Sequence, residues 1–126
     1  MKDITTITDV QQLVHTFYEE VRKDELLGPV FNSRLADQWE EHLEKMVRFW
    51  QTILLGEHTY SGYPFHPHAT LAIDASHFEK WVTIFQTTVD RLFTGTVADE
   101  AKNRGVLMAK IFQHKLEVLD QQKQHA

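Results

Sequence analysis

The 126-residue chain carries 13 Lys and Arg against 18 Asp and Glu, which gives a net charge of −5, and it contains no cysteine. The missing cysteines exclude disulfides, thiolate metal sites and cysteine nucleophiles, and the negative charge argues against nucleic-acid binding. No apolar run approaches the roughly 18–20 residues that span a bilayer, and the N-terminus has no signal-peptide pattern. We therefore expect a single cytoplasmic domain over residues 1–126, with its core over about residues 9–119.

Helical spacing predicts a first long helix over about residues 9–23, with Thr8 or Asp9 as its N-cap. Its apolar side chains recur three and four residues apart: Val10, Leu13, Val14, Phe17 and Val21. Gly28 and Pro29 then interrupt the pattern in "DELLGPVF". This segment is predicted to form short irregular turns.

A second long helix is predicted from about Asp37 to Gly56, because glycine is a natural C-terminal cap. Its apolar side chains keep the 3.6-residue period: Trp39, Leu43, Met46, Val47, Trp50, Ile53 and Leu54. Residues 56–67 then form a loop of about a dozen residues, which is longer than most connections in compact domains.

The segment "SHFE", from Ser76 to Glu79, matches a capping box and predicts a third helix that ends near Phe93. A fourth helix begins at Thr96 and keeps one apolar face to about Leu119. Nothing alternates with the period of two that strands require. The chain is therefore predicted to be all-α with four main helices, and the long loop favours a globin-like sandwich over an up-and-down bundle.

Two histidines flank a proline in the segment "SGYPFHPHATL". Pro67 fixes its own backbone near helical values and keeps His66 extended, so His68 can stand rigidly at the start of a helical turn. A rigid imidazole suits a metal ligand, although a polar loop histidine gives the same pattern. A zinc site made from His66 and His68 with His58 or His77 is a further alternative, but these residues lack zinc-ligand spacing.

Polar side chains also mark the edges of the apolar faces on the first two long helices. His42 and Met46 are four residues apart and share one face, and Lys45 beside them can reach an anionic group at the mouth of a pocket. Tyr18 is offset by one residue from the core stripe, which places its hydroxyl near the core margin. A buried tyrosine hydroxyl needs a partner, which is either a backbone carbonyl or a bound ligand.

Several segments together resemble the truncated haemoglobins, specifically the group III type of bacteria. They are "FYEEVRKDELLGPVF", "WEEHLEKMVRFWQTILLGEHTYSGYP", His68 and "HFEKWVTIF", and they extend over about residues 10–118 in the order of the family. Each segment alone is a weak match, whereas their order and spacing are specific. The resemblance implies a shortened globin fold, a two-on-two helical sandwich around haem.

The resemblance also implies roles for individual residues near the haem iron. His68 matches the proximal histidine, which is the iron ligand. The opposite, distal side is matched by Tyr18, His42, Met46 and Trp81. In the family the tyrosine hydroxyl and the tryptophan N–H donate hydrogen bonds to the iron's ligand, and an apolar residue at the position of Met46 overhangs the iron.

Further haem contacts are expected around these residues. Phe31 matches the phenylalanine that packs on the porphyrin face. Lys45 is our first choice for the haem propionates, followed by Arg48, Tyr60 and His66. The haem is expected to be haem b, held without covalent bonds, because the chain has no C-x-x-C-H segment.

Such a protein is expected to be a monomer that binds dioxygen and related diatomic ligands, nitric oxide and carbon monoxide. Nitric oxide dioxygenase or peroxidase-like activity, supported by an unidentified reductase, is an enzymatic alternative. A haem-free helical interaction module and a non-haem histidine metal site are the alternatives outside haem chemistry.

Overall fold

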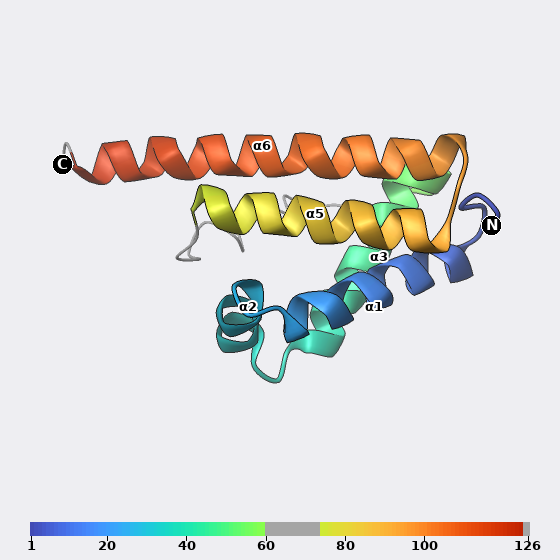
Figure 1. Ribbon diagram of the computed structural model, residues 1–126, viewed down its shortest axis with the longest axis horizontal. Helices are drawn as coiled ribbons and strands as arrows, with labels where there is room; N and C mark the ends of the chain where they lie inside the picture. Colours follow the sequence, from blue (N-terminus) through green and yellow to red (C-terminus); the bar gives the residue numbers. More distant parts are fainter. Residues whose placement is uncertain (60–73, 125–126) are drawn as a thin grey trace.

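The computed structural model describes residues 1–59 and 74–124, with side chains up to residue 118. These residues form five helices and no strand (Figure 1), so the all-α prediction is confirmed. The helices are α1 (Ile7–Lys23), α2 (Leu27–Leu35), α3 (Trp39–Leu55), α5 (Ala75–Leu92) and α6 (Thr96–Gln124). None of the described helices combines the length and hydropathy that a membrane span requires.

The long helices pack as two pairs. In Figure 1, α5 and α6 run side by side along the long axis of the molecule, and α1 lies below α5. The helix α1 contacts both α3 and α5, and α2 packs on α1. The pair α1 and α3 thus lies against the pair α5 and α6, which is the two-on-two arrangement that the resemblance predicts.

The first helix begins at Ile7, because Thr6 rather than Thr8 or Asp9 caps it. The Thr6 hydroxyl accepts a hydrogen bond from the Asp9 N–H at 3.3 Å, and the Asp9 carboxylate accepts from the Thr6 N–H at 3.1 Å. Asp9 is 3% exposed and also forms an ion pair with Lys2, with 2.7 Å between Oδ1 and Nζ. Burial raises the pKa of Asp9, but the Lys2 ammonium and the backbone donors outweigh burial and hold that pKa well below its ordinary value.

At neutral pH the free energy of unfolding of the Asp9→Asn variant is expected to be about 1–3 kcal/mol lower than that of wild type, because the substitution removes the carboxylate that accepts the charge-assisted hydrogen bonds. The folded-state pKa of Asp9 lies below the unfolded value of about 3.8. The carboxylate therefore stabilises the fold fully above the unfolded value, and its contribution falls as pH drops below it. Urea unfolding at neutral pH and near pH 3 measures the difference in unfolding free energy between wild type and variant. This difference should be smaller at pH 3.

The exposed Asp37 offers a matched control, since Asp37→Asn makes the same substitution at a carboxylate that is exposed to solvent. That variant should differ little from wild type at either pH. A stability gap for Asp9→Asn that is equally large at neutral and acid pH would contradict the ionised role assigned to Asp9.

The prediction of irregular turns after the first helix is wrong, because Leu27–Leu35 form the helix α2. Pro29 lies in its first turn, where a missing N–H breaks no helical hydrogen bond. The Asp24 carboxylate accepts hydrogen bonds from the N–H groups of Leu26 and Leu27 at 3.0 and 2.9 Å. A Cβ atom at Gly28 would lie 2.8 Å from the Arg22 carbonyl oxygen, so glycine lets α2 approach the end of α1.

The end of α3 and the start of α5 border the segment that the structure does not describe. The helix α3 ends at Gly56, which has a left-handed φ of 69°, as predicted. Asp74, rather than Ser76, caps α5, because its Oδ1 accepts hydrogen bonds from the Ser76 N–H at 3.0 Å and hydroxyl at 2.6 Å. The hydrogen bonds from Ser76 and His77 lower the pKa of Asp74 to about 2.

The first residues of the chain close onto the start of its last helix. The Asp3 carboxylate accepts hydrogen bonds from the N–H groups of Val97 at 3.0 Å and Ala98 at 2.8 Å. The Thr94 N–H donates to the Lys2 carbonyl at 3.0 Å. We term this contact, made by residues 2–3 and 94–98, the N-terminal clasp, and through it Asp3 caps α6.

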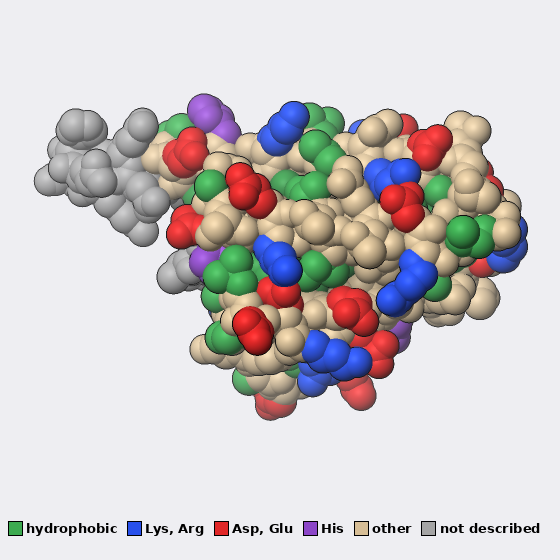
Figure 2. Space-filling model, in the orientation of Figure 1, with side chains coloured by type: hydrophobic (Ala, Val, Ile, Leu, Met, Phe, Trp, Pro, Cys, Tyr) green, Lys and Arg blue, Asp and Glu red, His purple; other side chains and the backbone are tan. Residues whose placement is uncertain are grey.

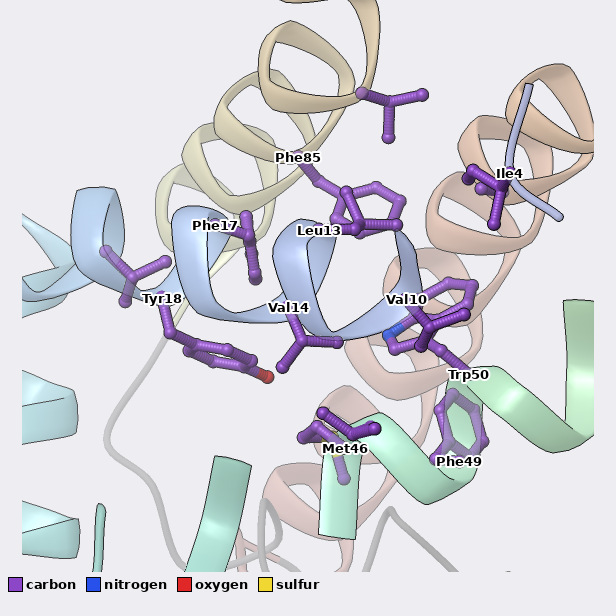
Figure 3. Packing of buried hydrophobic residues seen from close by; sticks show 14 of the residues in the cluster. Ile4, Val10, Leu13, Val14, Phe17, Tyr18, Met46, Phe49, Trp50 and Phe85 are labelled. Atoms are coloured by element: carbon purple, nitrogen blue, oxygen red, sulfur yellow. The ribbon is translucent and has the colours of Figure 1, made fainter. Parts of the chain in front are cut away.

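The core between the two helix pairs is aromatic. Phe85 is 1% exposed and stacks between Trp50 of α3 and Trp81 of α5, with ring centroids 5.0 and 5.3 Å away. Phe17 of α1 meets Phe85 edge-on at 5.1 Å. Figure 3 shows how side chains from α1, α3 and α5 converge here. We term Trp50, Phe85 and Trp81 the aromatic stack.

The surface carries charges of both signs. On the face that Figure 2 shows, Lys and Arg side chains are interspersed among Asp and Glu side chains, and no region of one sign dominates. This distribution agrees with the modest net charge of −5.

Candidate functional site

An apolar pocket lies between the two helix pairs and is partly open to solvent. The helices α1, α2 and α3 contribute the lining residues Tyr18, Leu27, Phe31, Met46 and Trp50. The helices α5 and α6 contribute His77, Phe78, Trp81, Met108, Ala109 and Phe112. The fold thus brings Tyr18, Phe31, Met46 and Trp81, all predicted as site residues from separate helices, to one pocket.

Tyr18 places its hydroxyl at this pocket. The residue is 4% exposed, and its ring packs edge-on against Phe17 with centroids 4.8 Å apart. Figure 3 shows the side chain of Tyr18 on the side of α1 that faces α3. No residue in the described ranges forms a hydrogen bond with the hydroxyl. Burial raises the pKa of Tyr18 far above its ordinary value, so the hydroxyl stays protonated and available as a donor.

Trp81 also lines the pocket, and its indole N–H is a second potential donor there. Its ring lies between Phe17, which meets it edge-on at 5.2 Å, and Phe85, which stacks on it at 5.3 Å. Among the described side chains, which end at residue 118, and the described backbone, the indole N–H forms no hydrogen bond. Because neighbours contact the ring on two sides, the direction of this N–H is fixed by packing.

His42 lies beside Tyr18 rather than on the pocket wall. The rings of His42 and Tyr18 are perpendicular, with centroids 5.0 Å apart, and Trp39 packs edge-on against His42 at 6.1 Å. The Nε2 atom of His42 is buried. The structure therefore connects His42 to the pocket through the Tyr18 ring.

Lys45 and Arg48, which were also predicted to contact the cofactor, lie in different surroundings. Lys45 is exposed on α3. Arg48 lines a separate polar groove between α1 and α3. Tyr60, His66 and His68 lie outside the described residues, so the iron ligand is a prediction from the sequence.

Several lining residues were not predicted as part of the haem site, and His77 is the titratable one among them. The His77 Nδ1 atom lies 3.2 Å from the Asp74 backbone nitrogen and 3.1 Å from Asp74 Oδ1, so the N-cap fixes the ring at the first turn of α5. The sequence placed His77 only among zinc alternatives. The apolar lining residues, such as Trp50 and Phe112, carry no sequence signal that separates a pocket wall from a core contact.

The described walls fit a flat, apolar cofactor. Most are aliphatic or aromatic, and the polar side-chain groups among them are the Tyr18 hydroxyl, the indoles of Trp50 and Trp81, and the His77 imidazole. Small-molecule sites are typically lined in this way, with a few polar groups that fix orientation. A porphyrin suits such walls, and the donors of Tyr18 and Trp81 suit a small polar ligand beside it. No group of three His, Cys, Asp or Glu side chains able to hold a metal ion occurs in the described part of the chain.

Comparison with known proteins agrees with the fold and the pocket. A family model described as "Bacterial-like globin" matches residues 3–117. The "Group 3 truncated hemoglobin ctb" of Campylobacter jejuni subsp. jejuni serotype O:2 is 33% identical over 111 residues, which cover 85% of this chain and 87% of that protein. The crystal structure of the group III truncated hemoglobin from Campylobacter jejuni matches with a TM-score of 0.83 at 32% identity and covers 92% of this chain and 95% of that one. The chain therefore belongs to the bacterial globins and, within them, to the group III truncated haemoglobins.

Membership of this family gives the pocket its general function. Truncated globins bind haem and, through it, diatomic ligands, and this chain shares their fold. The predicted fold class, a shortened globin with two helices over two, is confirmed.

Proposed function

We propose that this protein holds haem b and binds dioxygen, nitric oxide and carbon monoxide on the side of the haem that faces Tyr18. The observation that carries the proposal is the Tyr18 hydroxyl, which lies at a largely apolar pocket and forms no hydrogen bond with a described residue. A protonated hydroxyl in this position can donate to a polar ligand bound in the pocket.

The predicted residues divide the work between the two sides of the haem. When bound, haem would supply an iron that takes a diatomic ligand. His68 would hold the iron, and Tyr18 and Trp81, from α1 and α5, would donate hydrogen bonds to the ligand. Phe31 and Met46 keep the pocket apolar.

We further propose that His42 controls ligand entry. Its ring contacts the Tyr18 ring directly, so a rotation of His42 changes the space that Tyr18 can occupy. Because His42 lies beside the pocket wall rather than on it, its effect on a ligand already bound is indirect.

Lys45 remains our first choice for the haem propionates, with Arg48, Tyr60 and His66 behind it. Lys45 is exposed near the middle of α3, where its flexible stem lets the ammonium group reach a carboxylate at the pocket edge. Arg48 lies in the groove on the α1 side and needs another rotamer to make the same contact.

The absorption spectrum of the purified protein titrated with haem tests the proposal. We expect a Soret band that saturates at one haem per chain and shifts when carbon monoxide is added to the reduced protein. Haem added to buffer alone is the control, because unspecific association gives a broad band that does not saturate at this ratio. A titration without a saturable Soret band would leave only the haem-free helical module.

Redox chemistry on nitric oxide or peroxide is a second candidate function. Two donors aimed at one ligand favour slow ligand release, which suits a reaction at the haem better than transport. An enzyme of this kind needs an electron donor. We propose that a separate reductase supplies the electrons and that it binds the globin in its monomeric form. Consumption of nitric oxide or peroxide with a chemical reductant, faster in wild type than in Tyr18→Phe, is the expected result. Equal consumption by both proteins would show that the pocket donors take no part in such chemistry.

A further inference from the structure

The middle of α6 contains a glycine that helix propensity does not explain. Gly105 lies inside the helix Thr96–Gln124 and is buried. Glycine is the least favourable helix-interior residue after proline, and here neither a turn nor a positive φ requires it. A tertiary contact must therefore account for it.

The contact is with the aromatic stack. A Cβ atom at Gly105 would lie 2.7 and 2.9 Å from the Cδ2 and Cε2 atoms of Phe85, and 3.6 Å from Cζ3 of Trp81. The two distances to Phe85 are shorter than carbon atoms tolerate, so either the helix or the ring would have to move.

Phe85 has little freedom to move away. It is 1% exposed, its two faces are covered by Trp50 and Trp81 at 5.0 and 5.3 Å, and Phe17 meets its edge at 5.1 Å. Any displacement of Phe85 is therefore passed to the two indoles. Both indoles line the pocket.

We propose that Gly105 is a positioning residue for the ligand pocket. The missing side chain lets α6 approach Phe85 so closely that the aromatic stack holds the Trp81 N–H at a fixed place and direction. The inference rests on the proposed function in one respect, because it takes the Trp81 N–H as a donor to the bound ligand.

The test compares Gly105→Ala with a matched control on the same helix, Asn103→Ala, in the haem-loaded protein. Asn103 is exposed, so its replacement raises helix propensity without approaching the stack. We expect Asn103→Ala to behave as wild type. Gly105→Ala should change the tryptophan bands in the ultraviolet resonance Raman spectrum and shift the C–O stretching frequency of the carbon monoxide complex. It should also speed oxygen release by about 3- to 10-fold, less than the loss of a whole charge-assisted hydrogen bond.

Making room for the new methyl group should reverse these effects. The double variant Gly105→Ala with Phe85→Leu has a smaller, more flexible side chain opposite position 105. Adding Gly105→Ala to the Phe85→Leu variant should change the C–O stretching frequency and the rate of oxygen release less than adding Gly105→Ala to wild type does. If Gly105→Ala alone does not fold, recovery of a folded haem protein in the double variant supports the proposal, and failure of both overturns it.

The outcomes also separate this inference from the proposed function. If Trp81→Phe changes oxygen release while Gly105→Ala changes neither release nor the C–O stretch, the positioning role is overturned and the function stands. If Trp81→Phe changes nothing, the donor role of Trp81 fails, and the tryptophan Raman bands of Gly105→Ala alone decide whether Gly105 positions the stack.

Discussion

The His68→Ala variant is expected to lose most of its haem on gel filtration, and with it the Soret band. His68 follows Pro67, whose restricted backbone fixes the approach of the next residue, and it matches the proximal histidine of the family to which the chain belongs. Without an imidazole on the iron, only the apolar walls retain the haem. Added imidazole should restore part of the spectrum, because it supplies the missing ligand.

His66→Ala is the matched control, since it removes the other histidine of the same segment. Its spectrum should equal that of wild type, apart from slightly weaker haem retention if His66 contacts a propionate. If His66→Ala loses the haem and His68→Ala retains it, the two assignments must be exchanged.

Oxygen release is expected to be about 10- to 150-fold faster in Tyr18→Phe, and in Trp81→Phe, than in wild type. Bound dioxygen is polarised towards negative charge, so a donor to it forms a charge-assisted hydrogen bond worth about 1.5–3 kcal/mol, and each 1.4 kcal/mol is about tenfold in rate. Both substitutions remove a donor and keep an aromatic ring, so the packing around Phe17 is largely retained. Stopped-flow oxygen dissociation measures the change.

Carbon monoxide provides the internal control for these variants, because it is less polar when bound and should respond much less. The double variant should deviate from additivity, since two donors that share one ligand are coupled. His42→Leu should change release least and speed ligand entry most, as expected of a residue that contacts Tyr18 beside the pocket. Unchanged oxygen release in both single variants would refute the polar pocket and leave haem binding intact.

Most of the fold could be predicted from the sequence because apolar side chains at helical spacing mark α1, α3, α5 and α6 directly. The helix α2 could not, since Gly28 and Pro29 read as helix breakers when each is considered alone. Both fit the helix for reasons outside the local pattern: Pro29 lies in the first turn, and Gly28 lies against the Arg22 carbonyl. The sequence predicted Ser76 as the cap of α5, whereas the structure shows Asp74, because both residue types are good caps and stand two positions apart.

Without the family resemblance, which assigned Phe31, Met46 and Trp81 to the site, the pocket could be predicted only where a residue departs from the pattern of its helix. Tyr18 stands one position off the core stripe, and it proved to line the pocket. Trp50 and Phe112 lie on apolar stripes, and helical periodicity does not show whether such a side chain meets another core residue or an enclosed space. Lys45 and Arg48 are not among the lining residues of the pocket: Lys45 is exposed, and Arg48 lines a separate groove, which depends on how α3 is rotated against α1.

The N-terminal clasp has a consequence for the order of folding. Asp3 is separated from Val97 and Ala98 by 94 and 95 residues, so their hydrogen bonds close a loop of nearly the whole chain. Such a closure is entropically unfavourable until its ends have been brought together by other contacts, whereas neighbouring helices find each other sooner. We expect α5 and α6, joined by the short turn at residues 93–95, to pair before α1 is fixed against them. The cap of the last helix then comes from a residue that is synthesised 94 residues before the first of its partners, so during translation it must wait for that helix to be made.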